Sequence, residues 1–217
     1  MADKLFADVG GQLVNNWTVM KLSTSYRVTG NMARFVNEVM LRQNNLTAFK
    51  GPGPPVHYFT GSSYSALTAI GAELITMIKK GVIQPSDVFL LNASLNSSNI
   101  RVPIRVLENM LTESGIPVYV PQGDEDALKA DVIEGKVALS TFHSAKGLER
   151  KVVIIFGFSM KYFTYFAKEE DPTQCPCTLY VGTTRATDLL CVIAEEKEGE
   201  HLPFIGTLQI HYFMLTI

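Results

Sequence analysis

Short apolar runs alternate with longer segments of helical periodicity along most of the chain, and this alternation is the strongest constraint on its fold. The runs are rich in the β-branched and aromatic residues that fill buried strands. They lie at residues 56–59, 87–91, 116–120, 136–142, 151–157 and 189–194. Helices are predicted over residues 29–41, 64–80 and 102–114, where apolar side chains recur every three or four positions. This order predicts an α/β fold with a mostly parallel sheet flanked by helices on both faces.

Size and composition restrict the function as well as the fold. The chain has 217 residues, of which 47% are hydrophobic and 18% charged, so it can build a globular core. Its net charge of −2 gives no basic field over the whole molecule, and any contact with nucleic acid must come from a local groove. No stretch reaches the roughly 18 apolar residues of a membrane span, and the polar N-terminus does not resemble a signal peptide.

The three cysteines are Cys175, Cys177 and Cys191, and the first two form a C-P-C pair. An odd number in this arrangement makes neither a disulfide framework nor a four-ligand zinc site. We therefore expect a reduced, intracellular protein with no metal site built from its own residues and no contact with a membrane.

The segment STFHSAKGLE, residues 140–149, lies directly between two predicted strands. Small and hydroxyl-bearing residues with a glycine allow a backbone to approach phosphates or a sugar closely. Glu149 is suited to accept a hydrogen bond from a ribose hydroxyl, and His143 and Lys146 are suited to donate to phosphate. The alternative is an ordinary polar loop after a strand.

Two further segments combine arginine with small or aromatic residues. Residues 179–186 (LYVGTTRA) place Arg185 just before a predicted strand, and residues 22–27 (LSTSYR) place Tyr26 and Arg27 just before a predicted helix. A guanidinium presents a planar fork of donors that matches a phosphate, although an arginine in such a place also serves as a structural ion-pair partner. Tyr26 either fills core space or stacks on a base.

Together these segments resemble motifs of the UvrD/Rep-like superfamily 1 DNA helicases. TFHSAKGLE is similar to motif V of that family, LYVGTTRA to motif VI with Gly182 where alanine is common, and SYR to motif IV. The order and separations match over about residues 17–194. The resemblance implies a second RecA-like domain over residues 17–205, with a lead-in from a first domain at 1–16 and an apolar tail at 206–217.

The resemblance also implies roles at a nucleotide site. In this family the motif IV tyrosine stacks on adenine, so Tyr26 is expected to do so. Arg27 and Arg185 correspond to a pair of catalytic arginine fingers on the γ-phosphate of ATP. Glu149 is expected near the ribose, and Gly147 in the same loop is expected to belong to the nucleotide site.

The same resemblance implies a contact with DNA. The threonine and histidine of motif V lie near the backbone of single-stranded DNA in this family, which points to Thr141 and His143. Lys146 is expected to join them as a donor to phosphate.

Two departures from the family qualify this reading. The chain contains no G-x-x-x-x-G-K-[ST] loop and no acidic strand end suited to Mg²⁺, because residues 124–126 (DED) are expected to form a solvated turn. A first, N-terminal RecA-like domain is therefore the expected partner that cradles ATP and holds Mg²⁺, and the chain alone is expected to be inactive. Only residues 121–136 precede the predicted strand of motif V, so the helical subdomain that many relatives insert there is expected to be absent.

Two other interpretations remain open from the sequence. One is a helicase-like module that has lost catalysis and persists as a DNA-binding or scaffolding element. It explains poorly why Tyr26, Arg27, Glu149 and Arg185 all occur together. The other is an unrelated doubly wound enzyme that binds a small nucleotide, which lacks the glycine-rich phosphate loop it would need.

Overall fold

The structure is a computed structural model that describes residues 23–60, 63–95, 102–124, 128–194 and 201–205. The predicted lead-in at 1–16 and the apolar tail at 206–217 lie outside these ranges. Within them, the chain forms a six-stranded sheet in the order β3-β8-β7-β4-β6-β5, and every pair of neighbouring strands is parallel. The strands are β3 (His57–Phe59), β4 (Val88–Asn92), β5 (Val118–Tyr119), β6 (Val137–Thr141), β7 (Arg150–Phe158) and β8 (Ala186–Ala194). The predicted α/β fold with a parallel sheet is confirmed.

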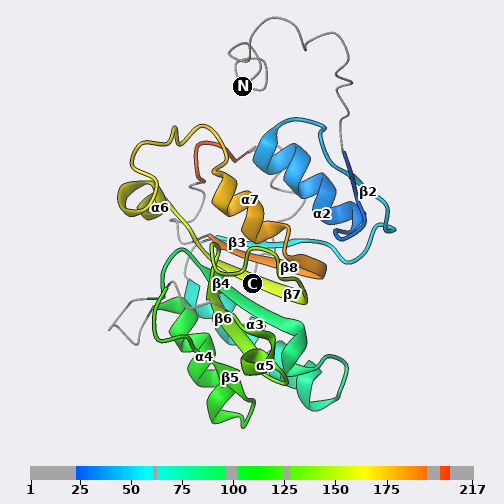
Figure 1. Ribbon diagram of the computed structural model, residues 1–217, viewed down its shortest axis with the longest axis vertical. Helices are drawn as coiled ribbons and strands as arrows, with labels where there is room; N and C mark the ends of the chain where they lie inside the picture. Colours follow the sequence, from blue (N-terminus) through cyan, green and yellow to red (C-terminus); the bar gives the residue numbers. More distant parts are fainter. Residues whose placement is uncertain (1–22, 61–62, 96–101, 125–127, 195–200, 206–217) are drawn as a thin grey trace, which may run out of the picture.

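Helices cover both faces of this sheet (Figure 1). On one face lie α3 (Ser63–Lys79) and α4 (Pro103–Glu113). On the other lie α2 (Gly30–Arg34), which continues as the π-helical turn η2 (Phe35–Leu41), together with α6 (Met160–Tyr165) and α7 (Cys177–Thr183). The remaining elements are the parallel pair β1 (Thr24–Ser25) and β2 (Thr47–Ala48), the 3-10 turn η3 (Pro85–Asp87) and α5 (Ala130–Ile133).

The central strands are buried on both faces, which explains their continuous apolar sequences. In β7, Val153 and Ile155 pack into the core beneath α2 and α7, whereas Ile154 and Phe156 pack beneath α3 and α4. Successive side chains of a strand point to opposite faces, so one strand contributes to two separate apolar cores.

Between β5 and β6 the described residues form only the single turn of α5. No large helical insertion stands at this place in the part of the chain that the structure describes, as expected. Nor is any helix within these ranges long and apolar enough to cross a membrane.

A close contact joins α7 to the segment after β6. The Phe142 side chain is 1% exposed, and a Cβ added to Gly182 would lie 2.7 Å from its Cδ1 atom. An alanine at position 182 therefore does not fit unless a fully packed ring moves, and the glycine allows α7 to lie against the residues that follow β6.

We predict that Gly182→Ala destabilises the fold by about 1–3 kcal/mol through overpacking, more than the roughly 1 kcal/mol that alanine gains in a helix. Gly71→Ala in α3 is the matched control, because its nearest neighbour is the flexible tip of Met110. Urea unfolding of both variants measures the difference. A Gly182→Ala protein as stable as the wild type would show that Phe142 is free to adjust.

Candidate nucleotide site and nucleic-acid interface

A groove of about 520 Å³ lies where the segment before α2 meets the amino ends of β7 and β8. Its lining brings together four of the residues singled out by sequence, namely Tyr26, Arg27, Glu149 and Arg185. They come from three segments, and the first of these is more than a hundred residues before the other two in the sequence. The parallel sheet unites them because it sets the starts of β7 and β8 side by side, with Arg150 paired to Ala186.

Arg27 and Glu149 form an ion pair across this groove. Nε of Arg27 donates to Oε2 of Glu149 at 2.6 Å, and its Nη1 donates to the Thr184 carbonyl at 3.4 Å. Both side chains are well exposed, at 35% for Arg27 and 54% for Glu149. An exposed pair of this kind contributes little to stability, so either group can exchange its partner for a ligand at small cost.

Arg185 is held far more firmly. The residue is 8% exposed, and its guanidinium donates to the Val181 carbonyl at 2.9 Å, the Leu148 carbonyl at 3.3 Å and Oγ1 of Thr184 at 3.4 Å. Burial lowers the pKa of Arg185, and neighbouring Arg27 lowers it further while Glu149 opposes the shift. Arginine still keeps its proton at neutral pH, so Arg185 is a fixed positive charge bound to neutral acceptors.

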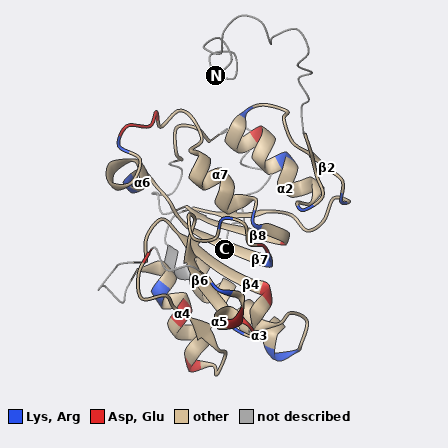
Figure 2. Ribbon diagram, viewed as in Figure 1, with Lys and Arg blue, Asp and Glu red and all other residues tan. Residues whose placement is uncertain are grey.

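The groove therefore contains two guanidinium groups and one carboxylate. The carboxylate of Glu149 is engaged by Arg27, whereas Arg185 donates to carbonyl and hydroxyl oxygens. The result is a local excess of one positive charge in a chain whose net charge is −2. Figure 2 shows lysine and arginine spread among acidic residues over many elements, so this excess is a property of the groove and not of a basic face.

Tyr26 stands at the edge of the groove with 70% of its surface exposed. Its ring centroid lies 4.7 Å from that of Phe49, at an interplanar angle of 37°. The partner ring is brought there by β2, since the Phe49 amide donates to the Ser25 carbonyl at 2.8 Å. Sequence reasoning missed Phe49, because nothing local indicates that β1 and β2 pair.

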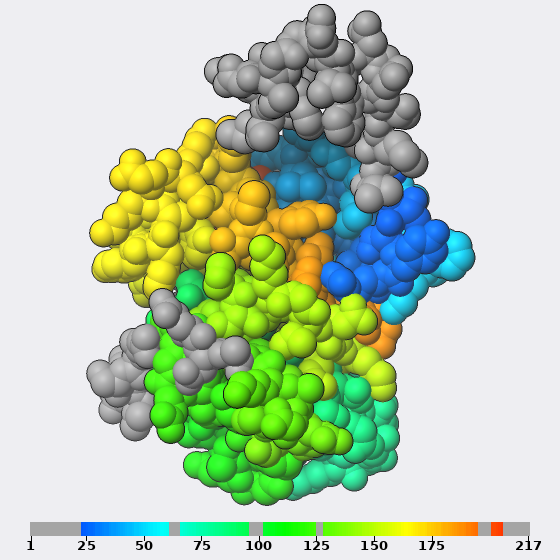
Figure 3. All heavy atoms as spheres, viewed as in Figure 1, coloured from blue at the N-terminus to red at the C-terminus, as the bar shows by residue number. Residues whose placement is uncertain are grey.

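The loop of residues 142–149 runs from the carboxyl ends of the strands, which we call the carboxyl edge of the sheet, to their amino ends, the amino edge. Thr141 at the carboxyl end of β6 is level with Asn92 at the end of β4, whereas Arg150 begins β7 at the amino edge. Because Leu91 pairs with Ile155, Thr141 is level with a position of β7 that lies about six residues after Arg150. Along the strand direction Thr141 and Arg150 are therefore roughly 20 Å apart, at about 3.3 Å per residue. In Figure 3 the yellow-green atoms of this region are exposed between the yellow α6 segment and the blue β1 segment.

Thr141, one of the residues predicted to contact DNA, therefore lies at the opposite end of the strands from the groove. Thr141 is buried, and its hydroxyl accepts from the Ser144 amide at 3.1 Å and donates to the Asp124 carbonyl at 3.3 Å. His143 and Lys146 are exposed in the loop that follows. Gly147 adopts a φ of +90° with open space around it, so the glycine serves the left-handed turn and leaves the backbone accessible.

Comparison with known proteins agrees with the fold and the motif order. Residues 94–197 match the family model described as the UvrD-like helicase C-terminal domain. A probable DNA helicase II homolog from Mycoplasma capricolum subsp. capricolum is 36% identical over 85 residues, covering 36% of this chain and 12% of that protein. The C-terminal domain of a possible DNA helicase from Lactobacillus plantarum WCFS1 has the same fold, with a TM-score of 0.54 at 18% identity over 88% of this chain and 97% of that one.

The family-model match assigns residues 94–197 to the UvrD-like helicase C-terminal domain.

This assignment confirms the family resemblance, and the matched residues include the segments similar to motifs V and VI. The match spans a small part of the Mycoplasma relative, so what a whole helicase does is not automatically a property of this chain. The roles of single residues remain predictions, and the geometry above shows which of these residues lie together.

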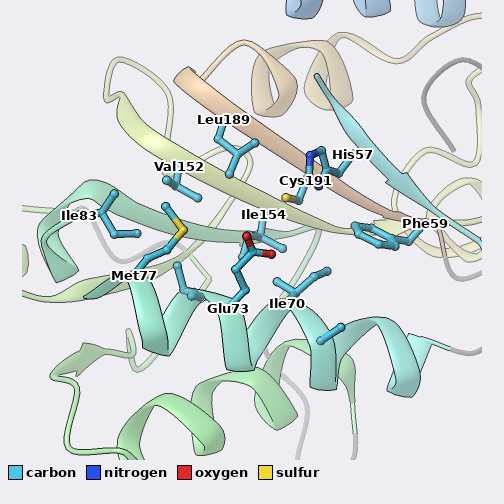
Figure 4. Close-up of a pocket in the computed structure, with 12 residues that line it drawn as sticks. His57, Phe59, Ile70, Glu73, Met77, Ile83, Val152, Ile154, Leu189 and Cys191 are labelled. Atoms are coloured by element: carbon cyan, nitrogen blue, oxygen red, sulfur yellow. The ribbon is translucent and has the colours of Figure 1, made fainter. Parts of the chain in front are cut away.

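The UvrD-like domain has a second cavity, of about 280 Å³, between α3 and strands β3, β8 and β7. Its walls are mostly apolar, and Figure 4 shows Glu73 of α3 projecting toward the strands that carry His57 and Cys191. Burial lowers the pKa of His57, which favours its neutral form, while Glu73 partly opposes the shift. A cavity whose charged residue is a carboxylate does not suit a triphosphate, so this cavity is not a candidate nucleotide site.

No group of three or more potential metal-ligating side chains occurs among the described residues of the domain. Asp124 is part-buried and not merely a solvated turn residue. Its carboxylate accepts from the hydroxyl of Ser94 and from the Leu95 amide, which ties the segment after β4 to the segment after β5. Asp124 is therefore engaged structurally, and residues 125–126 lie outside the described ranges.

The two arginines of the groove should differ in their effect on stability. Arg185→Ala removes three hydrogen bonds from a buried charged group and should lower the free energy of unfolding by about 2–3 kcal/mol. Arg27→Ala breaks an exposed pair and should cost less than about 1 kcal/mol. Chemical denaturation of both variants tests this order, and equal losses would contradict the structural asymmetry.

Thiol labelling should distinguish the cysteines of the domain. Burial raises the pKa of Cys175 and that of Cys191 to about 12 each, so neither thiol ionises near pH 8. Cys177 is exposed. Alkylation of the native protein at pH 8, followed by mass spectrometry, should modify one thiol rapidly, and all three should react in urea. Rapid native labelling of Cys175 would show that its surroundings open.

Proposed function

We propose that the chain is the second motor domain of an ATP-dependent DNA helicase. One observation carries the proposal, namely that Tyr26, Arg27, Glu149 and Arg185 line one groove with an excess positive charge. A flat exposed ring beside two guanidinium groups suits a nucleoside triphosphate, because the ring stacks on the base while the forks face the phosphates. Glu149 then lies where it can accept from a ribose hydroxyl.

The two arginines have different proposed roles because Arg185 is held more firmly than Arg27. Arg185 is preorganised by three acceptors and places its charge without reorganisation as the transition state forms. Arg27 is free to leave Glu149 and turn toward the γ-phosphate as the two domains close, which also releases the carboxylate for the sugar. Charge stabilisation of this kind is worth roughly 10³–10⁵ in the rate of phosphoryl transfer.

ATP and Mg²⁺ are shared with a partner domain in this proposal. The groove provides ring and guanidinium groups for the nucleotide, whereas its one carboxylate is already paired with Arg27. The Mg²⁺ ligands and the phosphate-cradling loop therefore come from a first RecA-like domain. When bound, the ion neutralises charge on the β- and γ-phosphates, and the residues of this chain position and complete the site from the other side.

The nucleotide site is tested in a polypeptide that carries both domains. Arg27→Ala and Arg185→Ala should each lower ATP turnover by about 10³-fold or more. Arg→Lys should restore little, because lysine lacks the planar fork. Tyr26→Ala should raise KM more than it lowers kcat, since it removes binding of the base and not charge stabilisation.

Lys80→Ala is the matched control, because this exposed lysine lies at the end of α3, which packs on the opposite face of the sheet from α7. Its turnover should equal that of the wild type. The chain by itself should not hydrolyse ATP. Wild-type turnover in both arginine variants, with circular dichroism showing an intact fold, would refute the proposed nucleotide site.

A further inference from the structure

A third cavity, of about 430 Å³, opens at the carboxyl ends of β4 and β7, between α6 and the start of α4. Asn92 and Gly157 mark the ends of the two strands at this cavity, and Tyr165 and Phe166 contribute to its lining. In Figure 1, α6 lies at the left of the sheet and β1 and β2 lie at the right, so this cavity and the nucleotide groove occupy opposite edges.

Tyr165 and Phe166 are exposed to an extent unusual for large apolar residues, at 67% and 54%. Phe166 is nevertheless held in place. The amides of Phe166 and Ala167 donate to the Tyr162 carbonyl at 2.9 and 3.1 Å. The ring of buried Tyr162 lies 6.1 Å from that of Phe166 at an angle of 30°. Fixed, exposed aromatic rings lose little entropy when a flat group stacks on them.

The polar groups around the rings favour nucleic acid over protein as the partner. Exposed Lys161 lines the cavity together with Asn92, Ser94 and Ser159, and no carboxylate occurs among its described lining residues. Lysine and serine are depleted in protein interfaces, whereas aromatic rings interleaved with a cation are typical of grooves for single strands.

The cavity is continuous with the residues already proposed to contact DNA. Asn92 pairs with Thr141, and its carbonyl accepts from the Phe142 amide at 3.1 Å, one residue before His143. On its other side the exposed acidic run Glu169–Asp171 follows α6 and repels phosphates. A single strand bound at α6 would therefore leave it toward His143 and Lys146.

We infer that Tyr165 and Phe166, with Lys161, form a base-stacking site that extends the single-stranded DNA track across the carboxyl edge of the sheet. The inference rests on the proposed function, because it assumes that His143 and Lys146 contact the same strand. The two rings take up bases without sequence preference, and Lys161 binds a phosphate between them and the loop.

The experiment measures binding of the chain to fluorescent oligo-dT, and to an abasic oligonucleotide of equal length, by anisotropy over a range of salt concentrations. Tyr165→Ala and Phe166→Ala should each weaken binding to oligo-dT by about tenfold and binding to the abasic strand by much less. Lys161→Ala should weaken both and reduce the salt slope by about one. Val82→Ala, which removes an exposed apolar side chain just after α3, is the control and should leave binding to oligo-dT unchanged.

The outcomes separate this inference from the function on which it rests. If His143→Ala and Lys146→Ala weaken binding while Tyr165→Ala and Phe166→Ala do not, the DNA track stands and the stacking site is refuted. Equal losses on oligo-dT and the abasic strand would also refute stacking, because the abasic strand has no bases for the rings to bind. If the wild-type chain binds neither oligonucleotide even at low salt, the DNA track and the stacking site both fail.

Discussion

The guanidinium of Arg185 is the contact on which the arrangement of the candidate sites depends. It donates to the end of α7 at the Val181 carbonyl and to the end of the 142–149 loop at the Leu148 carbonyl. A buried positive charge that lacked such acceptors would raise the free energy of the folded state. The burial of Arg185 therefore requires that the loop and α7 both stay in contact with its guanidinium. Phe142 packs against Gly182 at the other end of the same loop. The loop is thus fixed to α7 at both of its ends.

This attachment suggests how events at the two edges of the sheet are coupled. A change at the phosphates would act on Arg27 and Arg185 at the amino edge, and Arg185 is bonded directly to the loop that carries Lys146 and His143. The loop then reaches Thr141, whose strand is level with Asn92 beside the α6 rings. The path is contiguous and consists of named hydrogen bonds and one packed ring.

The sequence predicted much of the fold and four of the residues that line the candidate nucleotide groove, but not their surroundings. The long apolar runs became strands because the central strands of a parallel sheet are buried on both faces, so their signal is strong. The two-residue strands β1 and β2 carry no periodicity, and the pairing that brings Phe49 to Tyr26 is entirely tertiary.

Placement along the strands was also beyond the sequence. The nine residues similar to motif V read as one polar loop in the sequence, yet Thr141 and Glu149 lie at opposite ends of the strands because the loop runs the length of the sheet. The hydroxyl of Thr141, a residue predicted to lie near DNA, accepts from the Ser144 amide and so caps a turn, which the sequence did not indicate. Tyr165 and Phe166 resemble core residues in the sequence, and only the packing of α6 shows that they are exposed.

The central claim is that nucleotide and DNA bind at opposite edges of one sheet. Amide chemical-shift mapping of the isotopically labelled chain, titrated separately with ATP and with oligo-dT, tests it most directly. The account predicts that ATP perturbs residues near Tyr26, Glu149 and Arg185, while oligo-dT perturbs residues around His143 and from Gly157 to Ala167. Overlap of the two sets at a single edge would contradict the account.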